Sequence, residues 1–512
     1  MSTSPYSITA LRHSTWQFLT GKAISALFTF AILLWLVRLL PVEEYGAYVI
    51  MVAGMELIFA LSGLGLPWLA ARFLPEYHLY ASGAVLAEMC RKLLIWQMLS
   101  LLFFVMLIAT LLDSYLAWVG LERFHTSVQI YLVVLLVEGL GRFLREALLS
   151  PLMLQGEVRL SMVLRQLSFL ALIAILDFID HGALPWIICA ELAASTLGML
   201  IAVILLCRRL RGLKDQLIEP NWSVPALASQ WHIVWRMYAA QLLTLTYSPQ
   251  VFINLIQRTL GVEATALFGF LSSLQGQISR YLPATLLSSL IRPKLMASYV
   301  SGGGMAELSR NANLAGKLSL FALMPLLPLA ALGGSAFVYW LSAGKFMDSD
   351  LLLLGLMLVL VPYSQRQLND TVAVASGHSG LCTRAAISGL IMLPLMWVML
   401  QLDLGLWAAV IAIGLGHFLH NIVVVVGVAR YGYQSDWTGL AKLILSAFVA
   451  YGGSFLLSLV SPDILISSWL LVVVQCTVVA LIYLLCAWLV KPFTSSERNR
   501  INTIVKRRIF IW

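Results

Sequence analysis

Arg280 is the residue best suited to bind an anion within the apolar part of this sequence. It lies in an unusually polar run, Ser272–Tyr281, which also carries Gln277. A guanidinium presents paired N–H donors that match phosphate oxygens, and a charge inside a membrane is costly enough to need an explanation. We therefore expect Arg280 to bind an anionic group on a cavity wall, with Gln277 beside it. The alternative is a structural arginine that pairs with a neighbour or reaches the cytoplasmic interface.

Other polar groups inside apolar segments are candidates for the same cavity or for ion coupling. Lys22 is either a second cavity cation or a lysine that reaches the interface, and Asn254 is a candidate polar contact. Glu138 and Glu191 are carboxylates able to bind and release a coupling ion. The alternative for both acids is a structural role as buried carboxyls.

Basic residues recur where apolar segments end. Those expected at cytoplasmic ends are Arg142, Arg145, Arg165, Arg236, Arg292, Arg366 and Arg384. Most would orient the chain, and some would line an inward-facing mouth that attracts anions. Arg38 and Arg258 lie at the opposite ends, each followed by a glutamate (Glu43 and Glu263). A cation at a helix C-terminus and an acid at the next N-terminus match the helix dipoles; an outer gate is the alternative.

The sequence predicts no cofactor, metal or catalytic residue. His417, His420 and Asn421 share one helical face, but two histidines without a third ligand favour a polar packing seam. The six cysteines have no Cys-x-x-Cys spacing and are interpreted as small core residues.

The elements that must hold these residues are membrane helices. The chain has 512 residues, 60% hydrophobic and 11% charged, with a mean hydropathy of +0.89. Apolar runs long enough to cross ~30 Å of hydrocarbon recur along it. The sequence predicts an all-α polytopic membrane protein with about 14 transmembrane helices. They lie near 16–38, 46–70, 92–112, 124–144, 160–180, 184–207, 236–257, 264–288, 314–334, 350–367, 383–402, 406–428, 440–460 and 466–490.

The charge distribution supports this topology. Of the 33 Lys and Arg, all but Arg38, Arg123, Arg258 and Lys345 fall on one side of the predicted membrane, which is then the cytoplasmic side. Both termini are expected there, and the net charge of +9 is explained without a nucleic-acid partner. The basic and apolar tail suits an amphipathic helix on anionic lipids or, alternatively, a frayed basic tail.

One stretch occurs twice. Arg38–Tyr48 and Arg258–Phe268 share an arginine, a leucine, a helix breaker, a valine and a glutamate, 220 positions apart. The sequence therefore predicts two copies of one membrane unit with a site between them. We expect an N-lobe of six helices (1–207), a cytoplasmic linker (208–235), a C-lobe of six helices (236–430), two further helices (431–490) and a basic tail (491–512).

The repeat also suggests a partner for Glu56, which lies in mid-helix. The same offset places Ala60, one turn after Glu56, on Arg280. If equivalent faces of the two copies confront each other, Glu56 and Arg280 approach in one state and separate when an anion competes for the arginine. The alternative is a buried Glu56 that is hydrogen-bonded or protonated within its own lobe.

These stretches resemble a known family. Arg38–Tyr48, Gly63–Pro67 and Arg72–Tyr77 resemble the early helices of the polysaccharide-transporter branch of the multidrug/oligosaccharidyl-lipid/polysaccharide flippase superfamily, which includes O-antigen flippases. The resemblance implies two six-helix lobes around a cationic central cavity that opens alternately to either side of the bacterial inner membrane. It implies as cargo a lipid-linked oligosaccharide, carried on undecaprenyl diphosphate from the cytoplasmic to the periplasmic leaflet. A polysaccharide polymerase and chain-length machinery are the implied partners, and O-antigen, capsule and exopolysaccharide units all fit.

Two other classes fit the hydropathy. A membrane-embedded glycan polymerase or glycosyltransferase would use an acidic pair such as Asp348 and Asp350, but this pair lies in a short loop. A drug/cation antiporter of the same fold would favour acidic cavity residues, whereas Arg280 favours an anionic head group. We therefore expect a transporter rather than an enzyme.

Overall fold

The computed structural model describes residues 8–213, 222–224, 227–286, 304–347, 349–460 and 469–505. Arg292, Asp348, part of the predicted linker and the end of the predicted tail lie outside these ranges. The side chains of Lys22 and Arg236 also lie outside the description, although their backbones belong to described helices.

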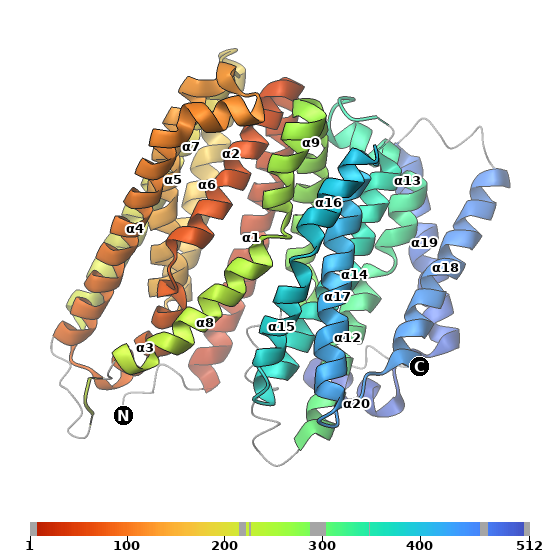
Figure 1. The fold of residues 1–512 in the computed structure, drawn as a ribbon. Helices are drawn as coiled ribbons and strands as arrows, with labels where there is room; N and C mark the ends of the chain where they lie inside the picture. Colours follow the sequence, from red (N-terminus) through yellow and green to blue (C-terminus); the bar gives the residue numbers. More distant parts are fainter. Residues whose placement is uncertain are drawn as a thin grey trace. The chain divides into compact units, whose positions relative to one another are not determined.

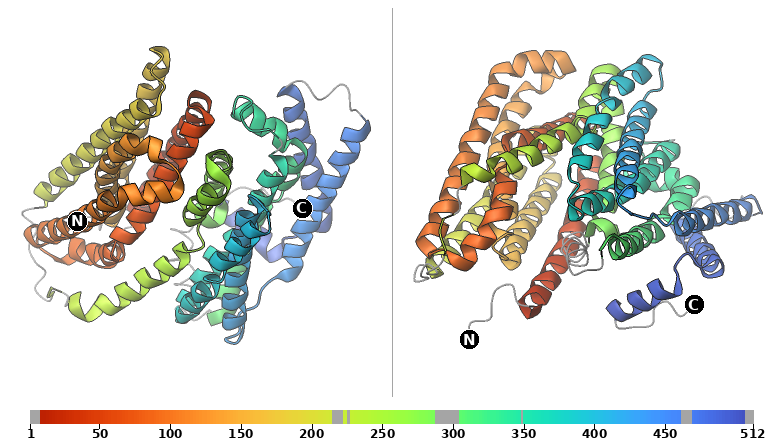
Figure 2. Two further views of the ribbon diagram at one scale, coloured as in Figure 1. Left: turned by 45° about the horizontal axis from the view of Figure 1, so that its top comes forward. Right: turned by 60° about the horizontal axis from the view of Figure 1, so that its bottom comes forward.

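The chain divides into two compact units, and the first comprises Met1–Leu245 and Gln250–Gly269. Within it, α4, α5, α6 and α7 run side by side, with α5 and α6 both packed on α7 (Figures 1 and 2). Its elements are α1 (Ile8–Leu39), α2 (Val42–Ser62), α3 (Leu66–Tyr80), α4 (Gly83–Val119), η1 (Glu122–Phe124), α5 (His125–Phe143), η2 (Leu144–Leu149), α6 (Gln155–Phe178), α7 (Leu184–Gly212), α8 (Leu227–Leu245) and the first part of α9 (Pro249–Tyr281).

The second unit comprises Thr246–Pro249 and Phe270–Trp512. Within it, α14 packs on α13 and α17, and α18 packs on α19 (Figure 1). After the end of α9 its described elements are α10 (Pro283–Leu286), α12 (Gly304–Leu323), α13 (Leu326–Leu341), α14 (Asp350–Ala375), α15 (Gly380–Gly389), α16 (Met392–Gln401), α17 (Trp407–Ala429), α18 (Trp437–Val460), α19 (Trp469–Val490) and α20 (Ser495–Val505).

The predicted all-α polytopic membrane fold is confirmed. All regular elements of the described residues are helices, and ten of them are long and apolar enough to cross a membrane. Ala23–Leu39 and Cys476–Val490 are shorter apolar helices within the same described chain. A helix satisfies its own backbone hydrogen bonds, which is why apolar runs of this length adopt it in lipid.

Both copies of the repeated stretch break at the predicted residue. α1 ends at Leu39 and α2 begins at Val42, just after Pro41, whose missing N–H is no loss at a helix start. In the second copy the break falls inside α9 at Gly261, whose φ of 86° favours glycine. The two helix breakers therefore lie at equivalent positions of the repeat, but Pro41 separates two helices whereas Gly261 interrupts one helix through its positive φ.

The division into units assigns α8 to the first unit, whereas the repeat assigns it to the C-lobe. Hydrogen bonds explain this assignment: the Tyr238 hydroxyl donates to the Leu61 carbonyl at 2.6 Å, and Trp68 Nε1 donates to Gln241 at 3.2 Å. The ends of α7 and α8 also extend into the range predicted as a linker. The lobe boundaries themselves stay a prediction.

The C-terminal helix α20 is held to α12 by a buried lysine. Lys317 is fully buried, and its Nζ lies 2.6 Å from a Glu497 oxygen and 2.7 Å from an Asp436 oxygen. Phe493 and Ile501 are buried in a cluster with Leu314. Part of the apolar face of the tail, which the sequence assigns to lipid, therefore packs on protein. Lys317, which the sequence assigns to chain orientation, is a buried cation that links α12 to α20.

We expect this contact to depend on pH through Asp436. Burial raises the pKa of Asp436, but hydrogen bonds from Lys317, the Gly439 N–H and the Thr438 hydroxyl outweigh it and lower the pKa to about 2 from its ordinary 3.8. A carboxyl with a lowered folded-state pKa stabilises the fold above its unfolded pKa, and this contribution is lost as the pH falls through the folded value. The difference in melting temperature between wild type and Asp436→Asn in detergent should be constant above about pH 4 and shrink between about pH 4 and pH 2.

The matched control is Asp113→Asn, because the Asp113 side chain is 92% exposed and lies 3.0 Å from a half-exposed histidine. It should show no such dependence. An Asp436→Asn difference that stays flat through the acidic range would contradict the proposed clamp.

Candidate functional site

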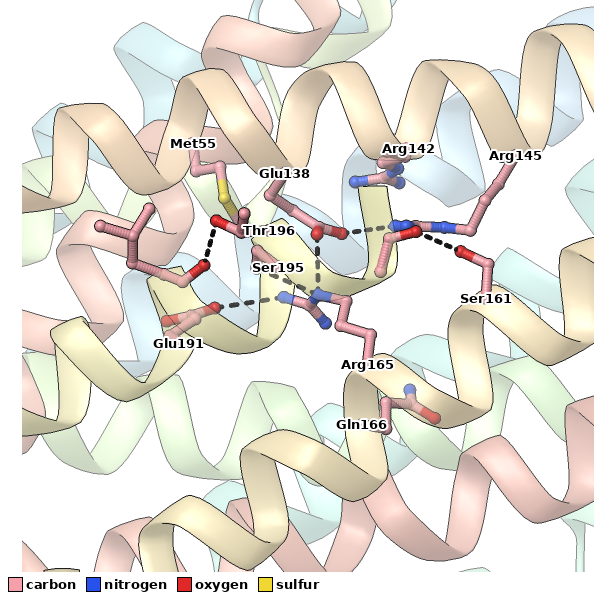
Figure 3. A network of polar contacts seen from close by, with 12 residues as sticks. Met55, Glu138, Arg142, Arg145, Ser161, Arg165, Gln166, Glu191, Ser195 and Thr196 are labelled. Carbon is pink, nitrogen blue, oxygen red and sulfur yellow. Dashed lines mark hydrogen bonds and ion pairs between the residues drawn. The ribbon is translucent and has the colours of Figure 1, made fainter. Parts of the chain in front are cut away.

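Charged side chains meet inside the first unit, among α5, α6, α7 and the π-helical turn η2 (Figure 3). Small residues let these helices approach closely. A Cβ on Gly198 of α7 would lie 2.8 Å from the Arg165 Cβ on α6, and Ser161 donates to the Gly198 carbonyl at 2.8 Å. Such residues are the usual means of close helix packing in membranes. The arginine of α6 is thereby brought to acids on the neighbouring helices.

Glu138 is the centre of this network. Its Oε1 lies 2.6 Å from Nη2 of Arg145, and its Oε2 lies 2.7 Å from Nε of Arg165. Glu138 and Arg145 are each only 6% exposed. Arg145 belongs to η2, and π-helical turns often occur at functional sites. One carboxylate thus serves two guanidiniums that would otherwise be costly to bury.

The network extends to α7 and α2 through Glu191. Arg165 reaches α7 through two nitrogens: its Nη2 lies 3.4 Å from Glu191, and its Nε donates to the Ser195 hydroxyl at 3.2 Å. The Tyr48 hydroxyl donates to the other oxygen of Glu191 at 3.0 Å. Glu191 is therefore satisfied mainly by a neutral donor and has a weaker cationic contact than Glu138.

A polar cavity of about 230 Å³ lies beside this network. Its wall includes Glu56, Gln97, Arg142, Glu146 and Gln241, together with two phenylalanines. Nη1 of Arg142 donates to both oxygens of Glu56, at 2.7 and 2.9 Å, and its Nε donates to Glu146 at 3.2 Å. The Arg142 and Glu56 side chains are 37% and 35% exposed, so this pair is open to the cavity.

The cavity wall is not cationic. It carries two carboxylates, Glu56 and Glu146, and one guanidinium, Arg142. The adjoining network adds two more carboxylates, on Glu138 and Glu191, and two more guanidiniums. An anion that binds Nη1 or Nε of Arg142 therefore competes with a carboxylate.

The predicted residues that come together are Glu56 with Arg142, and Glu138 with Arg145, Arg165 and Glu191. Arg145 and Arg165 were expected at an inward mouth, but they are buried in ion pairs within the first unit. Their predicted contribution to gating stays a prediction.

Three further predicted residues of the first unit lie elsewhere. Asn254 accepts a hydrogen bond from the Tyr115 hydroxyl at 2.6 Å, and Arg258 is exposed just before the break in α9. Arg38 lines a recess of about 620 Å³ together with Trp35 and Asp177. The cavity and outer-gate roles of these residues are untested.

Arg280 does not lie well inside a helix, so its predicted position is wrong. α9 ends at Tyr281, because Pro283 imposes an extended conformation on Leu282, whose ψ is 137°. Arg280 is consequently exposed in the last turn of α9, in the second unit. Gln277 lies one turn earlier, and its Oε1 is buried without a hydrogen bond to the described residues.

The predicted pairing of Glu56 with Arg280 stays a prediction. Glu56 is hydrogen-bonded within its own unit, to Arg142, as in the alternative that the sequence left open, but its side chain is 35% exposed and not buried. Arg366 lies on α14 of the second unit with a side chain 12% exposed, and Arg384 is exposed on α15 of the same unit. Sequence reasoning missed the contributions of Tyr48, Gln97 and Gln241, which are ordinary polar residues in helices remote along the chain.

The fold and family are shown by comparison with known proteins. A family model described as polysaccharide biosynthesis protein matches residues 11–318. No curated protein matches the sequence. Among solved structures, the lipid II flippase MurJ in an inward closed conformation is similar with a TM-score of 0.64 and 12% identity, over 96% of this chain and 99% of that one.

Multidrug transporters of the MATE type have a similar fold. The inward-facing structure of a multidrug resistance MATE family transporter of the MOP superfamily has a TM-score of 0.60 and 15% identity, over 82% of this chain and 98% of that one. A mutant form of the Vibrio cholerae MATE transporter VcmN has a TM-score of 0.55 and 13% identity, over 82% of this chain and 96% of that one. At these identities the likeness is one of fold.

Proposed function

Because the chain belongs to the polysaccharide biosynthesis protein family, we propose that it flips an undecaprenyl-diphosphate-linked oligosaccharide across the bacterial inner membrane, from the cytoplasmic to the periplasmic leaflet. Transport proceeds by alternating access through a central cavity, while the polyprenyl chain stays in lipid. Both termini are cytoplasmic, and a polysaccharide polymerase and chain-length machinery receive the cargo. The protein acts as a transporter and not as an enzyme.

The observation that carries this proposal is the Arg142–Glu56 pair on the wall of the polar cavity. Nη1 of Arg142 donates to both oxygens of Glu56, and its Nε donates to Glu146, so the guanidinium binds acidic oxygens of the kind that a phosphate also presents. A diphosphate head group can therefore take the place of Glu56 at Arg142, and Glu56 reclaims the arginine when the head group leaves. The exchange makes binding reversible, as transport requires.

The size of the cavity limits what it holds. At about 230 Å³ it is smaller than the range of about 300–1,000 Å³ that is usual for small-molecule sites. It suits a phosphate or a single sugar rather than a whole oligosaccharide. Gln97 and Gln241 on its wall offer amide groups that can hydrogen-bond to sugar hydroxyls.

One observation favours a second function, that of a drug/cation antiporter. The cavity has two carboxylates for one guanidinium, and an excess of negative charge attracts cations. The MATE transporters with a similar fold make this the natural competitor. The two functions differ in the cargo that competes for the cavity: an anion would displace Glu56, whereas a cation would displace Arg142.

A deletion strain distinguishes these functions in the cell. Loss of the proposed flippase should leave lipid-linked repeat units on the cytoplasmic leaflet, inaccessible to reagents added from outside. Sensitivity to cationic drugs without such accumulation would favour the antiporter. Units that reach the periplasmic leaflet but stay unpolymerised would instead indicate a polymerase.

A further inference from the structure

A second polar cluster lies in the second unit, where α14 packs on α17. His420 of α17 is 1% exposed, and its Nε2 lies 2.8 Å from Oδ1 of Asp370 on α14. Arg366, one turn before Asp370, lies 3.8 Å from the other carboxylate oxygen. It also contacts Nδ1 of His417 at 3.2 Å. The cluster is thus a chain of charged and titratable groups linking two packed helices.

The second ring nitrogen of His420 is unused. Because a carboxylate only accepts hydrogen bonds, Nε2 of His420 carries the hydrogen that is donated to Asp370. Nδ1 is then an acceptor, and it is buried with no hydrogen-bond partner among the described residues. A buried polar atom without a partner costs free energy. Protonation would turn this nitrogen into a donor and place a positive ring beside Asp370.

Among the described residues, the helices that pack on α17 bring one carboxylate to His420. Three helices pack against α17. α14 supplies Tyr363, Arg366 and Asp370, and α15 supplies Cys382 and the exposed Arg384. α16 has no titratable residue. His417 lies on α17 itself, and Tyr247 contacts the rings of this cluster from the residues before α9. With neutral imidazoles the charges of Arg366 and Asp370 cancel, so a proton on His420 adds one net positive charge.

Asp370 is the more exposed member of the pair. Its side chain is 29% exposed, whereas that of His420 is 2% exposed, and the two touch at 2.8 Å. Histidine is the side chain whose ordinary titration falls between about pH 5 and pH 8, the range in which a proton gradient acts. A proton can therefore reach the buried ring through the half-open carboxylate.

We propose that His420 and Asp370 form a proton-binding site that couples transport to a proton gradient. When His420 is protonated, Asp370 becomes its full ion-pair partner and its attraction for Arg366 weakens. The contact between α14 and α17 then has two states, set by one proton. The proposed proton binding does not depend on the proposed function. The proposed coupling of that proton to transport rests on the proposed function.

The direct test is an infrared titration of the purified full-length protein between about pH 5 and pH 8. The matched variant is His420→Gln, because the glutamine amide nitrogen occupies the place of Nε2 and keeps a donor for Asp370 without a titrating ring. The wild-type-minus-variant spectrum should show one imidazole gaining a proton together with a change in a carboxylate band. A wild-type-minus-variant spectrum without pH dependence would overturn the site.

The consequence is tested in liposomes under an imposed pH gradient. The ratio of flipping rates with and without the gradient should exceed one for wild type and fall to one for His420→Gln. His125→Gln is the control, because His125 forms an exposed pair with Asp113 at 3.0 Å; it should keep the wild-type ratio. A wild-type ratio in His420→Gln would overturn the coupling. Absence of flipping in every sample would count against the proposed function, and the infrared result would still decide the site.

Discussion

Replacing Glu138 with glutamine is expected to cause the largest loss of stability of any single change in the first unit. The Glu138 carboxylate lies 2.6 Å from Arg145 and 2.7 Å from Arg165, and its removal leaves two buried guanidiniums without their shared counter-charge. Removing one partner of a buried ion pair costs about 3–5 kcal/mol. The melting temperature of the detergent-purified protein should fall sharply, or the folded protein should fail to accumulate.

Glu88→Gln is the matched control, because Glu88 forms an exposed pair with Lys92 one turn away at 2.8 Å. Exposed pairs contribute little, so this variant should melt like wild type. A double variant that also replaces Arg145 with glutamine should recover part of the loss, since it removes one unpaired charge. Equal melting temperatures for Glu138→Gln and Glu88→Gln would show that the network does not stabilise the unit.

Replacing Arg142 with lysine is expected to have the largest effect on transport. Lysine keeps the charge but loses the planar guanidinium whose Nη1 binds Glu56, whose Nε binds Glu146 and which, in our proposal, binds phosphate. Loss of one charge-assisted hydrogen bond costs about 1.5–3 kcal/mol, which corresponds to a reduction of roughly 10- to 100-fold. The flipping rate in liposomes measures this effect, with melting temperatures confirming that the variant is folded.

The control for this change is Arg123→Lys. Arg123 lies 2.7 Å from Glu43 in an ion pair whose side chains are 54% and 53% exposed, away from the cavity. It should transport at the wild-type rate. If Arg142→Lys did so too, the cavity pair would not be part of the transport path.

The fold was predictable because its signals are local. Long apolar runs specify membrane helices, and Pro41 and Gly261 mark breaks that the structure contains. The position of Arg280 was also predictable from Pro283, which ends the preceding helix, but the apolar character of the flanking residues suggested a continuous one. Local backbone restriction outweighed hydropathy at that point.

The site was less predictable because its contacts join separate helices. Glu138 and Arg145 are seven residues apart and so lie on one helical face, a spacing that the sequence displays. Nothing in the sequence indicates that Arg165 reaches both Glu138 and Glu191. In the same way, Lys317 resembles an orienting surface lysine in the sequence, whereas in the structure it is buried in ion pairs with Asp436 and Glu497.

The central claim is that this protein moves a lipid-linked oligosaccharide, and reconstitution tests it most directly. The purified chain is placed in liposomes that contain an undecaprenyl-diphosphate-linked oligosaccharide in both leaflets, and the fraction open to an external glycosidase is followed over time. We predict that nearly all of the lipid becomes accessible with the wild type, and only the outer half at the same times with Arg142→Lys. Cleavage limited to the outer half with the wild type, together with efflux of a cationic drug, would contradict the account and favour the antiporter.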